Sequence, residues 1–239
     1  MGRIRRYRTA LSRHHRSKGH GIHSPFAFNF VRFVLREKSP YYCYDEMGEL
    51  RQAVVDSLRD EKNHPRVVSF KNLKMIFRIT NRFNPPCILQ VGSSYGLTSA
   101  SMLSVGPESR LWLYDPNLET YSVTARVLMS YLDRVECYNK LDVCIDEYRC
   151  GLPVGTAPFV LVNSIPEEYD FELLCSALSE MLSENCVIML GDLNRNDKIK
   201  RLWQHLKSVM SHGQSFTNEK TAVIVSQKKI NLEHFFLWF

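Results

Sequence analysis

The residues whose types and spacing best suit chemistry lie at 90–98, which read QVGSSYGLT, and at Asp115. An apolar run precedes this segment and a helical pattern follows it, which is the setting of a nucleotide-binding glycine turn. Gly92 would allow a tight turn and the approach of a ligand, and Gly96 would allow close packing at the helix start. Asp115 follows the next apolar run, about 20 residues on, where a carboxylate can accept both ribose hydroxyls. Together these residues predict an adenosyl ligand.

The glycine spacing narrows the choice of nucleotide. The turn is GxxxG, whereas nicotinamide enzymes use GxGxxG and phosphate-cradling loops use GxxxxGK[ST]. This difference argues against nicotinamide cofactors and ATP. A purely structural turn between a strand and a helix would carry the same glycines, so the ligand interpretation depends on Asp115 being in register.

Alternating apolar runs and helical patterns around this turn predict the elements that must position it. Five apolar runs separated by helices indicate parallel strands joined by right-handed crossovers. The expected strands are 87–91, 110–114, 135–138, 159–162 and 186–190, with an antiparallel pair at 214–218 and 221–226 and a last apolar run at 235–239. The expected helices are 97–104, 117–131, a short one after Asp142, one from a capping box at 164–167 to Met181, and 196–209.

The N-terminal part has a different organisation. Residues 1–20 read as a flexible basic arm and 21–84 as a helical layer or lid, integrated with the core at 85–239. Its helices are expected after the Ser24 cap, at Asp45 and from Ser69. A stripe of Phe26, Phe30 and Phe33 is expected in the core, and a loop with Tyr41, Tyr42 and Tyr44 is a hypothetical lid over a flat substrate.

Charge and cysteine content restrict the partners and the compartment. Nine of the 31 Lys and Arg residues lie in 1–36, which lacks Asp and Glu, so the rest has 22 basic and 25 acidic residues. The arm could therefore dock on a nucleic acid or anionic lipid, although a solvated tail is the simpler interpretation. Seven scattered cysteines without a CxxC pair argue against disulfides and zinc, and indicate the cytoplasm. Neither a secretory signal nor a membrane-spanning run is expected.

Three segments resemble the class I S-adenosylmethionine-dependent methyltransferases, and within them a bacterial branch related to catechol-type O-methyltransferases. Residues 18–26 read KGHGIHSPF, residues 41–44 read YYCY, and residues 88–96 read ILQVGSSYG. The similarity extends from about residue 18 to the end of the chain. It implies a Rossmann-like methyltransferase fold, in which a mostly parallel seven-stranded sheet carries helices on both faces and an N-terminal helical extension.

The resemblance also implies a site. The residues that would bind S-adenosylmethionine, and S-adenosylhomocysteine as product, are Gln90, Gly92, Ser93, Ser94, Tyr95, Gly96, Asp115 and Asp142. The turn would surround the methionine end of the cofactor, Asp115 would bind the ribose, and segment 139–142 would border the adenine. A substrate oxygen or nitrogen would attack the sulfonium methyl, with Asn163 and Asp192 as catalytic candidates and Lys198 as a further candidate for proton transfer.

Three positions depart from the family pattern. Gln90 stands where the relatives carry an acid, Asn163 replaces a strand-end Asp, and the sequence Gly191-Asp192 retains one acid of a pair. Divalent cations prefer several anionic oxygens, so a tight metal site is not expected. If these losses disabled the site, Gln90→Glu and Asn163→Asp should raise the affinity for cofactor or metal.

Two function classes remain open from sequence. The first is a methyltransferase acting on oxygen or nitrogen of a small molecule without a tightly bound metal. The second is a catalytically degenerate relative that serves as a binding or interaction module, and a homodimer is compatible with either class. An RNA-directed enzyme using the basic arm is a weaker third hypothesis, and no membrane partner is expected.

Overall fold

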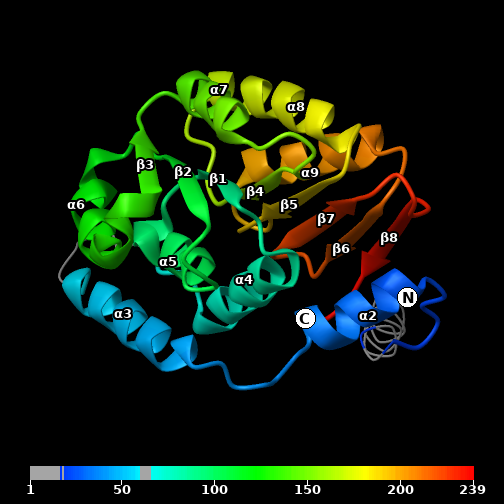
Figure 1. Ribbon diagram of the computed structural model, residues 1–239, viewed down its shortest axis with the longest axis horizontal. Coiled ribbons are helices and arrows are strands. Elements are labelled where there is room, and N and C mark those ends of the chain that lie inside the picture. The colour runs from blue at the N-terminus through cyan, green and yellow to red at the C-terminus, as the bar shows by residue number, and fades with distance from the viewer. Residues whose placement is uncertain (1–16, 18, 60–65) are drawn as a thin grey trace, which may run out of the picture.

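A computed structural model describes residues 17, 19–59 and 66–239, and within these it leaves the side chains of 118–121 undescribed. Its centre is one sheet of eight strands in the order β3-β2-β1-β4-β5-β7-β6-β8 (Figure 1). The strands are β1 Cys87–Val91, β2 Arg110–Tyr114, β3 Val135–Tyr138, β4 Phe159–Val162, β5 Cys186–Leu190, β6 Gln214–Thr217, β7 Ala222–Ser226 and β8 Glu233–Phe236. The five predicted parallel strands are confirmed with their bounds, and the predicted antiparallel pair is β6 with β7.

The sheet is one strand wider than the predicted seven. The chain turns after β7 and returns as β8, which pairs in parallel with β6 at the sheet edge. The ring of Phe235 stacks on that of Phe216 with centroids 5.2 Å apart. The last apolar run therefore forms an edge strand because it can bury an aromatic ring and pair its backbone at the same time.

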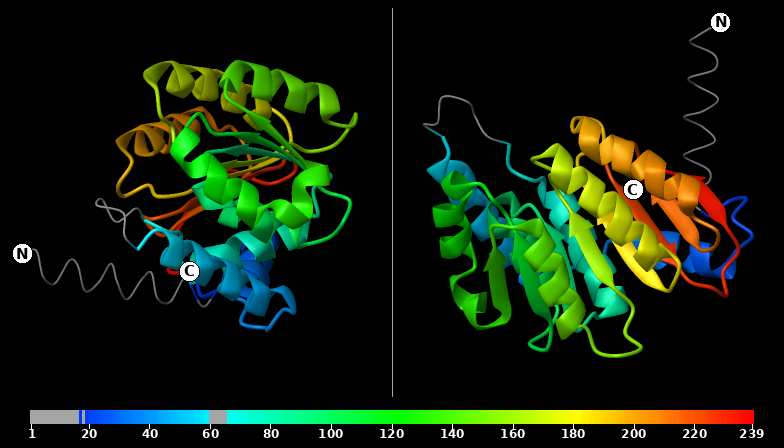
Figure 2. Two further views of the ribbon diagram at one scale, coloured as in Figure 1. Left: turned by 90° about the vertical axis from the view of Figure 1, so that its left-hand side faces the viewer. Right: turned by 90° about the horizontal axis from the view of Figure 1, so that it is seen from above.

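Helices cover both faces of the sheet in a three-layer arrangement (Figure 2). One face packs against α7 Leu141–Gly151, α8 Glu168–Leu182 and α9 Asp197–Val209. The other face packs against α4 Phe70–Phe83, α5 Leu97–Leu103 and α6 Leu118–Val127. Within β1, Leu89 and Val91 face the first group, whereas Ile88 faces the second. Because side chains two residues apart share a face of a strand, Gln90 lies on the same side of the sheet as Ile88, toward α5.

The N-terminal helices are α2 Pro25–Phe30, continued by a π-helical turn at Val31–Leu35, and α3 Cys43–Ser57, followed by α4. Ser24 caps α2 as predicted, with its Oγ 3.3 Å from the Ala27 nitrogen. The expected all-core phenylalanine stripe is wrong at one position, because Phe30 is buried but the side chain of Phe33 is 61% exposed. The π-helical turn adds a residue to the helical repeat, which moves the third position of the stripe off the core face.

Two other N-terminal predictions need correction. Tyr44 is buried inside α3, which begins at Cys43 rather than Asp45, and Tyr41 packs edge-on against Phe77 with centroids 4.9 Å apart. The rings of Tyr41 and Tyr44 therefore belong to the core instead of a lid, whereas Tyr42 is exposed. The packed body already includes Ser17, whose Oγ accepts a 2.6 Å hydrogen bond from the Trp238 nitrogen. Of the predicted arm at 1–20, residues 1–16 and 18 lie outside the described residues.

The predicted helix at 117–131 is two elements. α6 ends at Val127, and a 3₁₀ segment follows at Met129–Arg134. Arg134 donates to the Gly106 carbonyl at 2.6 Å, which ties this segment to the loop before β2. Among the described residues, no helix is both long and apolar enough to cross a membrane.

Candidate functional site

The glycine turn after β1 has an unusual backbone. Gly92, Ser94, Tyr95 and Gly96 all have positive φ, at 83°, 48°, 59° and 79°. For the two residues with side chains, the left-handed region costs about 1–2 kcal/mol each. Such strain persists only where surrounding contacts impose it, and it is concentrated at functional sites.

The two glycines are required by close neighbours as well as by φ. A Cβ on Gly92 would lie 2.2 Å from the Oγ of Ser164, and a Cβ on Gly96 would lie 3.1 Å from the Thr124 carbonyl oxygen. Gly96 thus permits α6 to approach the turn, as predicted for a packing glycine. The close neighbour of Gly92 in this structure is the Ser164 hydroxyl, from the loop after β4.

Asp115 lies beside the turn, as its position after the second strand predicts. β1 and β2 run parallel with Val91 paired to Tyr114, so their carboxyl ends coincide. The Asp115 carboxylate accepts hydrogen bonds from the backbone nitrogens of Ser93 at 3.0 Å and Asn117 at 2.9 Å. An acid and the glycine turn are therefore in one hydrogen-bonded unit, in which Asp115 is partly buried at the carboxyl ends of the strands.

Gln90 is fully buried and faces the turn from inside the protein. Its Nε2 donates to the Gly92 carbonyl and to the Thr98 Oγ1, both at 2.9 Å, and lies 3.3 Å from the Ser93 carbonyl. Its Oε1 accepts from the Ser99 hydroxyl at 2.8 Å. In this structure the amide is therefore engaged with the protein, and direct binding of a cofactor by Gln90 stays a prediction.

Asn163 meets the turn from the neighbouring strand. It follows β4, and its Nδ2 donates to the Gly92 carbonyl and to the Thr98 Oγ1, both at 3.0 Å. A Cβ on Gly191, at the end of β5, would lie 3.2 Å from the Asn163 Oδ1. Asp192 follows with a φ of 51° and an exposed side chain. Asn163 is thus joined to the turn, and no carboxylate among the described side chains hydrogen-bonds to it.

The remaining predicted residues lie at the margin of this unit. Asp142 is exposed in the first turn of α7, and its carboxylate accepts from the Val143 nitrogen at 2.8 Å. Lys198 donates from Nζ to the Pro166 carbonyl. Within the described part of the chain, neither side chain hydrogen-bonds to the glycine turn.

The loop between β4 and α8 is held from several sides. The predicted capping box at Ser164 and Glu167 is wrong, because the helix begins one turn later with Glu167 as its N-cap and Asp170 as the partner. Tyr114 explains this shift, since its hydroxyl donates to Asp170 at 2.9 Å and anchors that carboxylate in the core. Burial raises the pKa of Tyr114, and the hydrogen bond to Asp170 raises it further. The phenol therefore remains a donor at neutral pH.

Sequence reasoning missed the polar residues that hold the turn from behind. Thr98 and Ser99 in α5 receive and orient the Gln90 amide, and Thr124 in α6 donates to the Ser93 hydroxyl at 3.1 Å. All three are buried. One signal was available, because the helix after the turn carries Thr98, Ser99 and Ser101 among apolar residues and follows a buried strand with one polar position.

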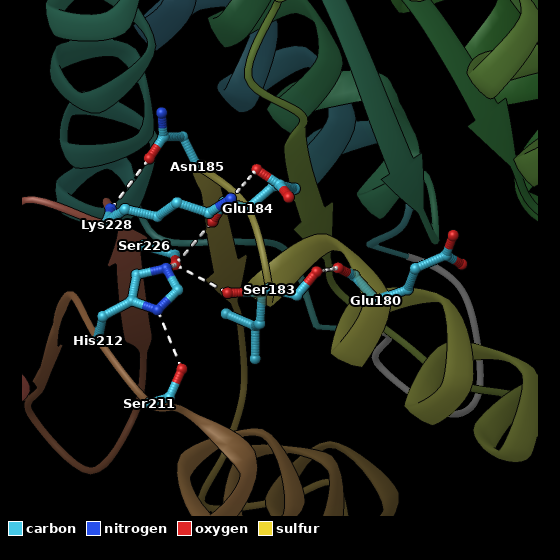
Figure 3. Close-up of polar contacts among 9 residues, drawn as sticks. Glu180, Ser183, Glu184, Asn185, Ser211, His212, Ser226 and Lys228 are labelled. Atoms are coloured by element: carbon cyan, nitrogen blue, oxygen red, sulfur yellow. Dashed lines mark hydrogen bonds and ion pairs between the residues drawn. The ribbon is translucent and has the colours of Figure 1, made fainter.

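A second polar cluster has residue types that suggest a hydrolase. Figure 3 shows His212 between Ser226, 3.0 Å from its Nε2, and Ser211, 3.0 Å from its Nδ1. However, Ser226 is buried, and its hydroxyl also lies within 3.0 Å of the carbonyls of Leu182 and Glu184. A nucleophile must be accessible and its histidine oriented, so this cluster fastens β7 to the turn before β5 and has no catalytic geometry.

Two hollows in the described part of the chain lie away from the glycine turn. One of about 620 Å³ lies near the amino ends of β4 and β5 and is lined by Arg149, Pro158, Glu180 and Asn185. Salt bridges at its rim join Arg149 to Glu180 and Lys228 to Glu184, each at 2.6 Å (the latter drawn in Figure 3). The other, about 220 Å³, lies beside Phe33. We place the site at the turn because hydrogen bonding and backbone strain converge there.

Comparison with known proteins supports the architecture. No protein-family model matches the chain, and no curated protein matches its sequence. Among solved structures, cofactor-bound Rv0187 from MTB superposes with a TM-score of 0.59 at 12% identity, over 77% of this chain and 91% of that one. The O-methyltransferase TomG from Streptomyces achromogenes, in complex with SAM, has a TM-score of 0.54 at 15% identity, over 82% and 95%.

A putative caffeoyl-CoA O-methyltransferase from Staphylococcus aureus gives a TM-score of 0.53 at 12% identity, over 77% of this chain and 98% of that one. At these identities the likeness concerns the fold. The strand order 3-2-1-4-5-7-6, with β7 as the antiparallel strand, agrees with it. The chain has the Rossmann-like fold of the class I S-adenosylmethionine-dependent methyltransferases.

Proposed function

We propose that the protein is an S-adenosylmethionine-dependent methyltransferase that acts on an oxygen or nitrogen of a small molecule. The observation that carries the proposal is the strained turn at 92–96 with the Asp115 carboxylate bonded to the Ser93 nitrogen, at the carboxyl ends of β1 and β2. In open α/β sheets ligands bind at the carboxyl ends of the strands, at the point where the strand order reverses. In this sheet the reversal lies between β1 and β4.

The residues present fit an adenosyl cofactor. Asp115 offers a partly buried carboxylate for vicinal hydroxyls, and Asp142 lies at the start of the helix after the neighbouring strand β3. When bound, S-adenosylmethionine supplies an electrophilic methyl group on a sulfonium. The turn and Asp115 would orient that group, which accounts for much of the catalysis expected in a transfer of this kind.

The proton of the acceptor group needs a base. Asp192 is the carboxylate that follows β5, exposed and adjacent in sequence to the Gly191 that contacts Asn163. It is the better of the two catalytic candidates, because the Asn163 amide nitrogen is directed at the turn and carries no basic lone pair. We assign Asp192 the role of accepting the proton as the new bond to the methyl carbon forms.

Titration with S-adenosylhomocysteine, followed by calorimetry and thermal unfolding, tests the proposal. Ligand at 100 times its dissociation constant stabilises a fold by about 2.7 kcal/mol, or roughly 5–10 °C for a chain of this size. Asp115→Asn serves as the matched variant. Absence of binding by the wild-type protein at millimolar ligand would refute the proposed function, and binding would justify a screen of phenolic and amine acceptors with radiolabelled cofactor.

A further inference from the structure

Two side-chain amides from different strands converge on the same two acceptors. Gln90, on β1, donates to the Gly92 carbonyl and the Thr98 hydroxyl at 2.9 Å each. Asn163, after β4, donates to the same two oxygens at 3.0 Å each. We call Gln90 and Asn163 the amide pair. Its contacts bind the turn to the start of α5 and to the end of the adjacent strand.

The chemistry of the acceptors requires amides at both positions. A backbone carbonyl can only accept, so the atom that faces Gly92 must carry hydrogen. A carboxylate at either position would set an oxygen about 3 Å from the carbonyl oxygen, with no proton between them. Because Gln90 is fully buried, water cannot relieve such a contact there.

The neighbouring positions are matched to the pair. Ser99 donates to the Gln90 Oε1 at 2.8 Å, which fixes the orientation of that amide. Gly191 leaves the space beside Asn163 open, since a Cβ there would lie 3.2 Å from the Asn163 Oδ1. A chain that had merely lost its acids would leave polar groups unpaired, whereas here both amides are bonded.

We infer that the amide pair is a positioning device that holds the glycine turn in its cofactor-binding shape, and that Asn163 serves at its strand end as a donor to the turn rather than as a metal ligand. This inference rests on the proposed methyltransferase function. Asn163 is then a positioning residue that acts through Gly92.

The side chains at the carboxyl ends of β4 and β5 do not provide suitable ligands for a divalent metal. Asn163 presents an N–H to the turn, and the ends of β4 and β5 add the single carboxylate of Asp192. Mg²⁺ and Ca²⁺ require several oxygen ligands, usually with more than one negative charge. Over the described residues, no group of three or more potential metal-binding side chains occurs.

The test compares Asn163→Asp and Asn163→Ala with the wild type, and uses Asn29→Asp, on the exposed face of α2, as the control for added charge. Thermal unfolding is measured from pH 5 to pH 8 without ligand, together with hydrogen exchange of the backbone amides at 93–98. Apart from the substituted position, the four proteins carry the same titratable groups, so the difference between curves isolates position 163. The affinity for S-adenosylhomocysteine is then measured with and without Mg²⁺.

We expect Asn163→Asp to melt several degrees below wild type at pH 8, to exchange faster at 93–98, and to bind the ligand at least about tenfold more weakly. Because a protonated carboxyl can donate to the Gly92 carbonyl, the deficit should shrink as the pH falls toward 5. Asn163→Ala should lose affinity without this pH dependence, and Asn29→Asp should resemble wild type.

Two results would overturn the inference: wild-type stability of Asn163→Asp at pH 8, or a Mg²⁺-dependent gain in its ligand affinity beyond that of wild type. The unfolding and exchange measurements need no ligand. If wild type fails to bind S-adenosylhomocysteine, the proposed function fails, but the amide pair is still tested.

Discussion

Replacing Gln90 with glutamate would place a carboxylate where the structure needs a donor. The side chain is fully buried, and its Nε2 serves the Gly92 carbonyl and the Thr98 hydroxyl at 2.9 Å. The oxygen that accepts from Ser99 survives the change, so the loss is confined to one end of the amide. The sequence predicts that this substitution raises cofactor affinity if loss of the acid disabled the site, whereas the contacts predict damage.

The size of the stability loss follows from the cost of keeping the new carboxyl protonated. Protonating a glutamate of ordinary pKa, about 4.3, costs about 3.7 kcal/mol at pH 7 and about 1 kcal/mol at pH 5. The protonated form regains one donor of two, which leaves a further loss of about 1 kcal/mol. Gln90→Glu should therefore be less stable than wild type by about 4–5 kcal/mol at pH 7, and by about 2 kcal/mol at pH 5.

The direction of the pH dependence is fixed by linkage. Folding would raise the pKa of the buried carboxyl. The stability deficit of the variant is therefore smallest below the pKa of the carboxyl in the unfolded chain, and it widens as the pH rises toward the pKa in the folded protein. At pH 7 the melting temperature should fall by roughly 8–20 °C. Circular dichroism melts at half-unit pH intervals measure this, with Gln204→Glu on the exposed face of α9 as the matched control.

A different result would refute the reasoning. If Gln90→Glu is as stable as wild type at pH 7, or binds S-adenosylhomocysteine more tightly, the Gln90 amide does not hold the turn in the way that its contacts indicate. A deficit that is equal at pH 5 and pH 7 would show that the substitution acts through shape rather than charge.

Three further predictions follow from single contacts. Gly92→Ala should lose several kcal/mol, because its φ is 83° and the Cβ would meet the Ser164 Oγ at 2.2 Å, and adding Ser164→Ala should recover part of the loss in urea unfolding. Asp115→Asn should weaken S-adenosylhomocysteine binding roughly tenfold in calorimetry, since a charged acceptor becomes neutral, and urea unfolding should show a loss of about 1–2 kcal/mol, because one of the two oxygens that accept from the Ser93 and Asn117 nitrogens becomes a donor. Burial raises the pKa of Cys144 to about 12, so stability should fall as the pH rises above 9, and Cys144→Ala should flatten that decline in melts from pH 8 to 10.5.

Local patterns in the sequence were sufficient for most of the fold. The bounds of the five parallel strands were predicted correctly, because buried strands are short apolar runs and the turn residues around them restrict the backbone. The glycine turn and Asp115 could be placed together for a similar reason, since the carboxyl ends of adjacent parallel strands must meet. The edge strand β8 was not predicted as a strand, because pairing at a sheet edge depends on the partner available.

The tertiary structure decided what the unusual residues do. Gln90 and Asn163 read as lost acids in sequence, 73 positions apart, and only the parallel pairing of β1 with β4 brings them to one carbonyl. Likewise, the place of Glu167 as N-cap depends on Tyr114 anchoring Asp170 from another strand. Hydrogen bonds are directional and short, so the partner of a buried polar group is set by packing across the whole domain rather than by its neighbours in the chain.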